Sequence, residues 1–399
     1  MTKILLIGLL ISSQLLSAQD FFRLTGKIRN PPQDYLTFTY YPDWISEPRE
    51  YTLKINADSS YLVEFPLDHI AYCDLSFGEH GLHLLKIEPG DQIHLTFDND
   101  DFDRTVRVEG HGASKWNFQL KLRQKYEVDH DHEMELSNFR AYNRAAFFDK
   151  AETLMKEQTA LLDEEAALFS PDFYALQKAD ITGKFKLKES GYLNFNRLPD
   201  STIQINWGTF SEDTRNRSIY LGQLAEGLMQ NMLSGFRHKD SRTLEYEYLK
   251  SMKNTVGQSL TERILAARIL DYVNLDGLTE EIKLIGDDYL YFSDNATYKK
   301  VLAARFRRNE VLETGREAPG FIVENRKGGL VELKDFRGKN LVLGFYDTEC
   351  FLCMEDIKAM EFVEGFMPEK KTWPLFLSIL AHVKATVTFS KPGNPWAFT

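Results

Sequence analysis

Short apolar runs alternate with polar residues between about residues 21 and 112, and turns rich in Pro, Gly and Asp separate them. A period of two places alternate side chains on one face, which predicts half-buried β-strands. We therefore expect a small antiparallel β-sandwich over residues 19–112. The expected strands are 22–28, 35–40, 61–65, 82–87, 92–97 and 105–109.

The pattern becomes helical from about Ser114 to Arg308, which predicts an all-α region over residues 113–312. Ser170-Pro171-Asp172 is typical of a break followed by a new helix start. The stretch without proline from Asp213 to Leu312 predicts several further helices. Five apolar residues share one helical face between residues 144 and 169: Phe147, Ala151, Leu154, Leu161 and Leu168.

Two finer predictions concern residues 259–277. Ser259 with Glu262 fits a capping box at the start of a helix. The stretch from Asp271 to Gly277 is expected to form a turn. The nearby aromatic residues Tyr289, Tyr291 and Phe292 are expected in the core rather than at a ligand.

The stretch from Leu341 to Ile357 combines a short apolar run, a polar turn, C-x-x-C and a helix-forming segment. Residues 341–346 are expected to form a buried strand. Cys350 would then lie at a helix N-terminus, where unpaired N–H groups and the helix dipole favour thiolate over thiol. Cys353, one turn later, could close a disulfide with it.

Composition limits the remaining possibilities. The chain has 399 residues, 43% of them hydrophobic, which indicates two or three domains. The net charge of −11 and pI near 5.4, without a basic patch, argue against nucleic-acid binding. The three cysteines, Cys73, Cys350 and Cys353, are too few for a structural disulfide framework. Cys73 is expected to be a buried apolar residue.

Residues 1–18 predict a secretory signal peptide that is cleaved after Ala18, and hence export to the periplasm. The alternative, a membrane anchor, needs about 18 uninterrupted apolar residues. Ser12, Ser13 and Gln14 interrupt this stretch, and no later segment is apolar enough to span a membrane.

Three polar groupings could suggest a metal, but each has a simpler interpretation. The acidic run between Asp98 and Asp103 lacks the Gly and distal Glu of a calcium loop and suits an exposed hairpin turn. His83 and His94 are expected to face solvent on adjacent strands. The cluster around His130 and His132 suits a charged loop. We predict no metal and no cofactor.

An ordered set of motifs leads to the C-x-x-C: G-x-x-A-P-x-F at 315–321, G-x-x-V-x-L at 328–333 and D-F-R-G-K at 335–339. A lone C-x-x-C could be half of a zinc site, but no second cysteine pair exists to complete one. The ordered set resembles the redoxin branch of the thioredoxin-like superfamily, and more closely the TlpA/ResA-type thiol-disulfide oxidoreductases. The opening LTGKI and the later EPGD more loosely resemble the small β-domain that precedes such redoxins.

The resemblance implies a thioredoxin-like α/β domain over residues 313–399, with Cys350 as attacking thiolate and Cys353 as resolving thiol. Asp356 stands where the family often carries a Glu, and would accept a proton near Cys353 or simply be solvated. Protein thiols or disulfides and a redox partner protein are the implied partners.

The end of the chain departs from the family pattern. After residues 373–379, which suit the next strand, the family would continue through two further strands and a cis-Pro loop. Neither Pro392 nor Pro395 has the surroundings of that proline. We expect an incomplete, truncated domain whose family-like sequence ends near Ser378–Leu380; the alternative is a tail that completes the fold differently.

The sequence thus predicts a multidomain α+β protein, with a β-sandwich, a central all-α region and a thioredoxin-like domain. The predicted function is an exported thiol-disulfide oxidoreductase, whose activity the short C-terminus would impair. One alternative is a periplasmic binding or scaffold protein with a vestigial redoxin, and another is a metal-binding protein that uses His130 and His132.

Overall fold

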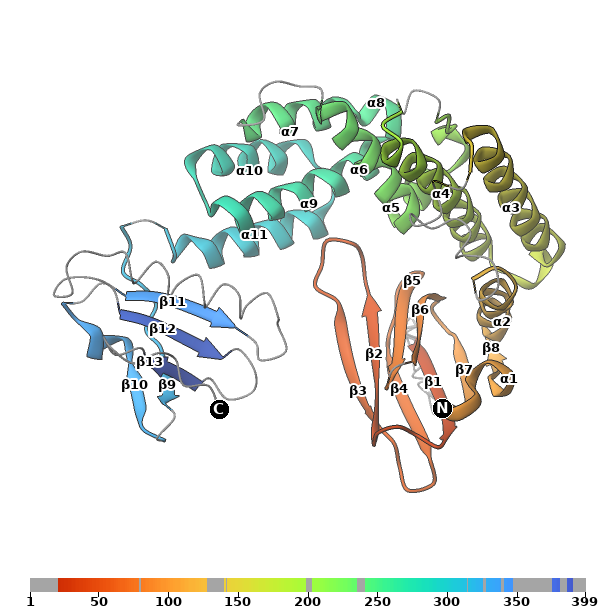
Figure 1. Cartoon of the computed structure of the whole chain (residues 1–399), viewed down its shortest axis with the longest axis horizontal. Coiled ribbons are helices and arrows are strands. Elements are labelled where there is room, and N and C mark those ends of the chain that lie inside the picture. The colour runs from red at the N-terminus through yellow and green to blue at the C-terminus, as the bar shows by residue number, and fades with distance from the viewer. Residues whose placement is uncertain are drawn as a thin grey trace, which may run out of the picture. The chain divides into compact units, whose positions relative to one another are not determined.

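The chain divides into two compact units, residues 1–307 and residues 308–399. The first contains two β-sheets and the helices, and the second contains a separate sheet (Figure 1). The predicted signal peptide lies outside the described residues. The computed structural model describes residues 21–78, 80–127, 140, 142–198, 203–234, 241–313, 315–325, 328–338, 341–346, 375–380 and 386–389.

The first unit begins with two four-stranded sheets whose inner faces share one apolar core. The first sheet has the order β4 (Ser60–Pro66), β1 (Phe21–Arg29), β7 (Gln92–Asp98), β8 (Arg107–His111). The second has the order β3 (Arg49–Lys54), β2 (Tyr35–Tyr41), β5 (Ala71–Phe77), β6 (His80–Ile87).

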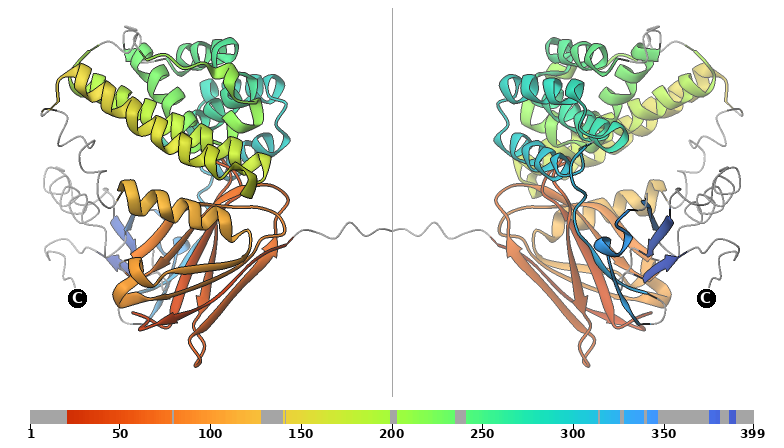
Figure 2. Two further views of the ribbon diagram at one scale, coloured as in Figure 1. Left: turned by 90° about the vertical axis from the view of Figure 1, so that its right-hand side faces the viewer. Right: turned by 90° about the vertical axis from the view of Figure 1, so that its left-hand side faces the viewer.

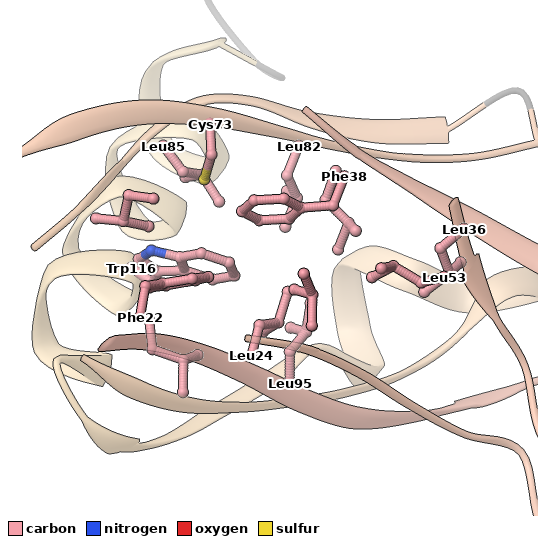
Figure 3. Close-up of a cluster of buried hydrophobic side chains, with 14 of the residues drawn as sticks. Phe22, Leu24, Leu36, Phe38, Leu53, Cys73, Leu82, Leu85, Leu95 and Trp116 are labelled. Atoms are coloured by element: carbon pink, nitrogen blue, oxygen red, sulfur yellow. The ribbon is translucent and has the colours of Figure 1, made fainter. Parts of the chain in front are cut away.

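The sandwich core follows from the alternation in the sequence. Phe22 and Leu24 on β1 are fully buried, while their neighbours in the strand face outward. Trp116, from the first long helix after the strands, enters the same core and donates a hydrogen bond from Nε1 to the Lys86 carbonyl oxygen at 3.1 Å. Figure 3 shows its ring beside Phe22. The helix therefore helps to close the sandwich.

Two predictions about the sandwich were wrong in detail. β1 pairs with β7 in parallel, with Leu24 opposite Ile93, so the sandwich is not purely antiparallel. His83 and His94 are both exposed, but they lie on strands of different sheets and so are not on adjacent strands. Alternation identifies strands and their inner faces, but it carries no information about which distant strands pair.

The acidic stretch between β7 and β8 forms the connection of an antiparallel pair, as the hairpin prediction requires. It does so through a 3₁₀ turn (Asn99–Asp101) and one turn of helix, α1 (Phe102–Thr105). Phe102 points into the sandwich core, so the turn is anchored by an apolar contact.

Helices make up the rest of the first unit, as predicted. They are α2 (Ala113–Leu122), a π-helical turn (Arg123–Glu127), α3 (Arg144–Glu164), a 3₁₀ turn (Ala166–Leu168), α4 (Pro171–Phe195), a 3₁₀ turn (Trp207–Thr209), α5 (Glu212–Arg217), α6 (Ile219–Ser234), α7 (Arg242–Ser251), α8 (Lys253–Val256), α9 (Gln258–Asp276), α10 (Glu280–Phe292) and α11 (Ala296–Glu310).

The predicted break at Ser170 is confirmed. The Ser170 hydroxyl accepts a hydrogen bond from the Phe173 N–H at 3.0 Å and caps α4, with Pro171 in the first turn. Such a cap satisfies one of the free N–H groups of the first turn.

Three predictions about α9 and α10 were wrong. The N-cap of α9 is Gly257, and Glu262 instead accepts hydrogen bonds from the Gln258 side chain and the Asp294 N–H. α9 continues through Asp271 to Asp276, so the turn starts only at Gly277. Tyr291 is 92% exposed, although its neighbour Tyr289 is buried.

The helices pack directly on the sandwich within the first unit, and Figure 2 shows them gathered on one side of it. Tyr72 of β5 shares an apolar cluster with Phe147 of α3 and Phe173 of α4. A buried ion pair adds to this contact, because Lys86 Nζ lies 2.7 Å from the Asp180 carboxylate, and both side chains are 4% exposed.

The second unit contains a mixed five-stranded sheet. Its order is β10 (Leu330–Glu332), β9 (Ile322–Asn325), β13 (Thr386–Phe389), β12 (Leu375–Leu380), β11 (Leu341–Tyr346). β11 pairs with β12 and β13 with β9 in parallel, and the other two pairs are antiparallel. β12 confirms the strand expected near residues 373–379. One further strand, β13, follows the point where family-like sequence is expected to end.

Candidate dithiol site

Strand β11 leads directly into the candidate site. It spans residues 341–346, as predicted, and pairs in parallel with β12 from Leu341 opposite Leu375 to Tyr346 opposite Leu380. The carboxyl ends of both strands therefore lie at one edge of the sheet, where α/β folds commonly bind ligands. Cys350, Cys353 and Asp356 follow β11 in the sequence and lie outside the described residues, so their geometry stays a prediction.

A small apolar cluster supports β11. Val323 of β9, Val331 of β10 and Phe336 are buried together. Leu341 and Leu343 of β11 pack against this cluster. β11, the strand that precedes Cys350 in the sequence, therefore packs against the segment that contains the upstream motifs.

The glycine of the G-x-x-V-x-L motif forms the turn of the β9–β10 hairpin. Gly328 has a φ of 77°, in the left-handed region that side chains disfavour. Its N–H donates to the Asn325 carbonyl oxygen at 2.9 Å, and the Asn325 side chain accepts from the Gly329 N–H at 3.1 Å. Val331 of the same motif provides one of the three buried side chains.

The D-F-R-G-K motif forms a capped 3₁₀ turn (Leu333–Phe336). The Asp335 carboxylate accepts a hydrogen bond from the Glu332 N–H at 2.9 Å, as one half of a capping box. Phe336 is buried in the cluster, and Gly338 has a φ of 77°. These motif residues thus have local structural roles in the segment before β11.

Cys73 belongs to no reactive site. It lies on β5 in the sandwich core as a fully buried free thiol, which confirms the prediction. Burial, with added repulsion from Asp74 and Asp91, raises its thiol pKa well above the usual value.

No described residues form a cluster of three or more His, Cys, Asp and Glu side chains that could hold a metal. His83 instead contacts the Asp74 carboxylate at 3.4 Å, and His94 shares a hydrogen bond with the Thr25 hydroxyl at 3.0 Å. The His130 and His132 cluster lies outside the described residues. Among the helices that the structure describes, none has the length and apolar character to cross a bilayer.

Comparison with known proteins identifies the class of the second unit. Residues 314–375 match the AhpC/TSA family. This segment is therefore similar to redoxins of the TlpA/ResA-like kind, a class with a thioredoxin-like fold.

The similar proteins are thiol-disulfide oxidoreductases named ResA. Those from Bacillus thuringiensis subsp. konkukian and Bacillus cereus are 42% identical over 55 residues, which is 14% of this chain and 32% of the relative. The ResA protein of Bacillus subtilis is 35% identical over 57 residues, which is again 14% of this chain and 32% of the relative. The chain thus spans about a third of the length of these relatives. No solved structure matches the chain.

The buried polar groups between the sandwich and the helices could not be found from the sequence. Lys86 lies in a strand where a lysine would ordinarily face water, yet it is 3% exposed and donates to the Gln177 amide oxygen at 2.9 Å. Its other partner, Asp180, lies on a helix far along the chain. No local pattern could have connected these residues.

Proposed function

We propose that this chain is an exported thiol-disulfide oxidoreductase that reduces or exchanges protein disulfides through Cys350 and Cys353. The observation that carries the proposal is the family match over residues 314–375, because this range includes both cysteines and Asp356. The strand that precedes the C-x-x-C and the ordered motifs before it support the same assignment.

The proposed reaction is a two-step exchange. The Cys350 thiolate attacks one sulfur of a substrate disulfide, the substrate S–S bond breaks, and one substrate thiolate leaves and takes up a proton. Cys353 then loses its proton, with Asp356 as acceptor, and attacks the Cys350 sulfur of the mixed disulfide. The second substrate thiol leaves, and Cys350 and Cys353 end as a disulfide. A redox partner protein with a dithiol must supply two electrons to reduce this disulfide again.

The residues around the cysteines favour a reducing site. The spacer Phe351-Leu352 offers no cation, and Glu349 and Glu355 place negative charge nearby. Both features oppose the lowering of the thiol pKa by the helix N-terminus. We expect a midpoint potential well below about −120 mV, the value of a strongly oxidising dithiol protein. Equilibration in glutathione buffers, followed by alkylation, measures it; a value near −120 mV would refute this expectation.

The direct test of the activity is reduction of insulin disulfides by the mature chain, with dithiothreitol as electron donor. We expect turnover that is lost in Cys350→Ser. Cys353→Ser should instead accumulate a mixed disulfide between Cys350 and the substrate, because the resolving thiol is missing. Cys73→Ala is the matched control and should keep full activity, since Cys73 is buried in the other unit.

A chain without turnover, whose Cys350 is still alkylated readily, would contradict the proposal and favour the binding or scaffold interpretation. Export is tested separately. Mass spectrometry of protein recovered from the periplasm should give an N-terminus at Gln19, and an intact residue 1–18 segment on protein in the cytoplasm would refute the signal peptide.

A further inference from the structure

We draw no further inference here: the strongest candidate, the cavity of about 190 Å³ between the loop after β2, helix α5 and the start of α11, carries nothing because its charged side chains are paired within the chain, as Arg217 is with Asp213, and none of the described buried polar side-chain atoms that line it lacks a hydrogen bond.

Discussion

Cys73 shows how the position of a residue decides its reactivity. The thiolate is the reactive form of cysteine, and burial in the sandwich core raises the thiol pKa because a charged sulfur would lose its hydration. Cys73 is therefore mostly protonated at neutral pH, and the surrounding side chains block reagents.

The Cys350→Ser/Cys353→Ser double variant isolates this thiol for measurement. In the native state we expect almost no reaction with Ellman's reagent over minutes, and one reactive thiol per chain after unfolding in guanidinium chloride. Rapid reaction in the native state would show that the sandwich core opens easily, contrary to the burial described above.

Single residues also show where sequence reasoning succeeds. The burial of Cys73 was predicted correctly, because a cysteine outside a reactive motif commonly packs as a small apolar residue. The prediction that Tyr291 lies in the core was wrong, and the burial of Lys86 was not predicted. Their exposure depends on which neighbouring element covers each side chain, and residue type alone does not reveal this.

At the scale of elements, the crossing of α4 and α6 depends on one glycine. A Cβ atom at Gly183 would lie 2.7 Å from the Leu221 backbone nitrogen, which is closer than such contacts allow. Gly227, also in a helix, would have nothing within 4 Å of an added Cβ.

The two glycines form a matched pair of variants. Gly183→Ala should lower the free energy of unfolding by about 1–3 kcal/mol, because the two helices must move apart. Gly227→Ala should raise it by up to about 1 kcal/mol through helix propensity alone. Urea denaturation followed by circular dichroism measures both, and equal effects of the two changes would contradict the close helix packing.

Glu281 joins α10 to the start of α7. Its carboxylate accepts hydrogen bonds from the N–H and hydroxyl of Thr243, both at 2.9 Å. The backbone hydrogen bond from Thr243 is the main reason that the pKa of Glu281 is lowered from its usual 4.5. A carboxylate at this position also complements the positive end of the α7 dipole.

A lowered pKa in the folded state means that this contribution is present above about pH 4.5 and is lost as the pH falls through the folded-state pKa. Glu281→Gln should therefore destabilise the chain by about 0.5 kcal/mol at neutral pH. The difference from the wild type should shrink toward zero near pH 3. Thermal unfolding of the wild type and Glu281→Gln between pH 7 and about pH 3 measures this difference in stability. A difference that does not change with pH would show that the charge of Glu281 plays no role.

Element types were largely predictable from the sequence, and element boundaries were less so. Ser170-Pro171 marked a helix start correctly because both residues act locally through the backbone. Ser259 and Glu262 had the spacing of a capping box, yet the Glu262 carboxylate accepts a hydrogen bond from the N–H of Asp294, between α10 and α11, instead. A capping signal fails when a distant element competes for the same carboxylate.

For the whole first unit, the buried pair of Lys86 and Asp180 connects the sandwich to the helices. Asp180→Ala would leave the Lys86 ammonium buried without its counter-ion. Breaking a buried pair in this way typically costs about 3–5 kcal/mol.

We expect Asp180→Ala to lower the stability of strands and helices together, because both share one apolar cluster. Tryptophan fluorescence and far-UV circular dichroism should report the same lowered midpoint in urea. Glu152→Ala, which removes an exposed pair with Lys156, should leave the midpoint nearly unchanged. Two separate transitions in the variant would show that sandwich and helices fold independently.

At the scale of the whole molecule, the sequence predicted which regions are β, helical or redoxin-like. It did not predict how the helices pack on the sandwich. The motifs before Cys350 predicted the redoxin because they are local and ordered. The buried contact of Lys86 with Asp180 was not predictable, since β6 and α4 are separated by many residues and only the packing of the helices on the sandwich brings them together.

The parallel pairing of β1 with β7 bears on how the chain folds during synthesis. A hairpin of neighbouring strands can form as soon as both have emerged, but β1 gains its second partner only when residues up to Asp98 are available. Until then one side of β1 is an open edge that could join another chain. A chaperone that keeps the nascent chain unfolded until β7 emerges would prevent this pairing with another chain. Chain fragments that end between β4 and β7 should therefore depend most strongly on chaperones to remain soluble.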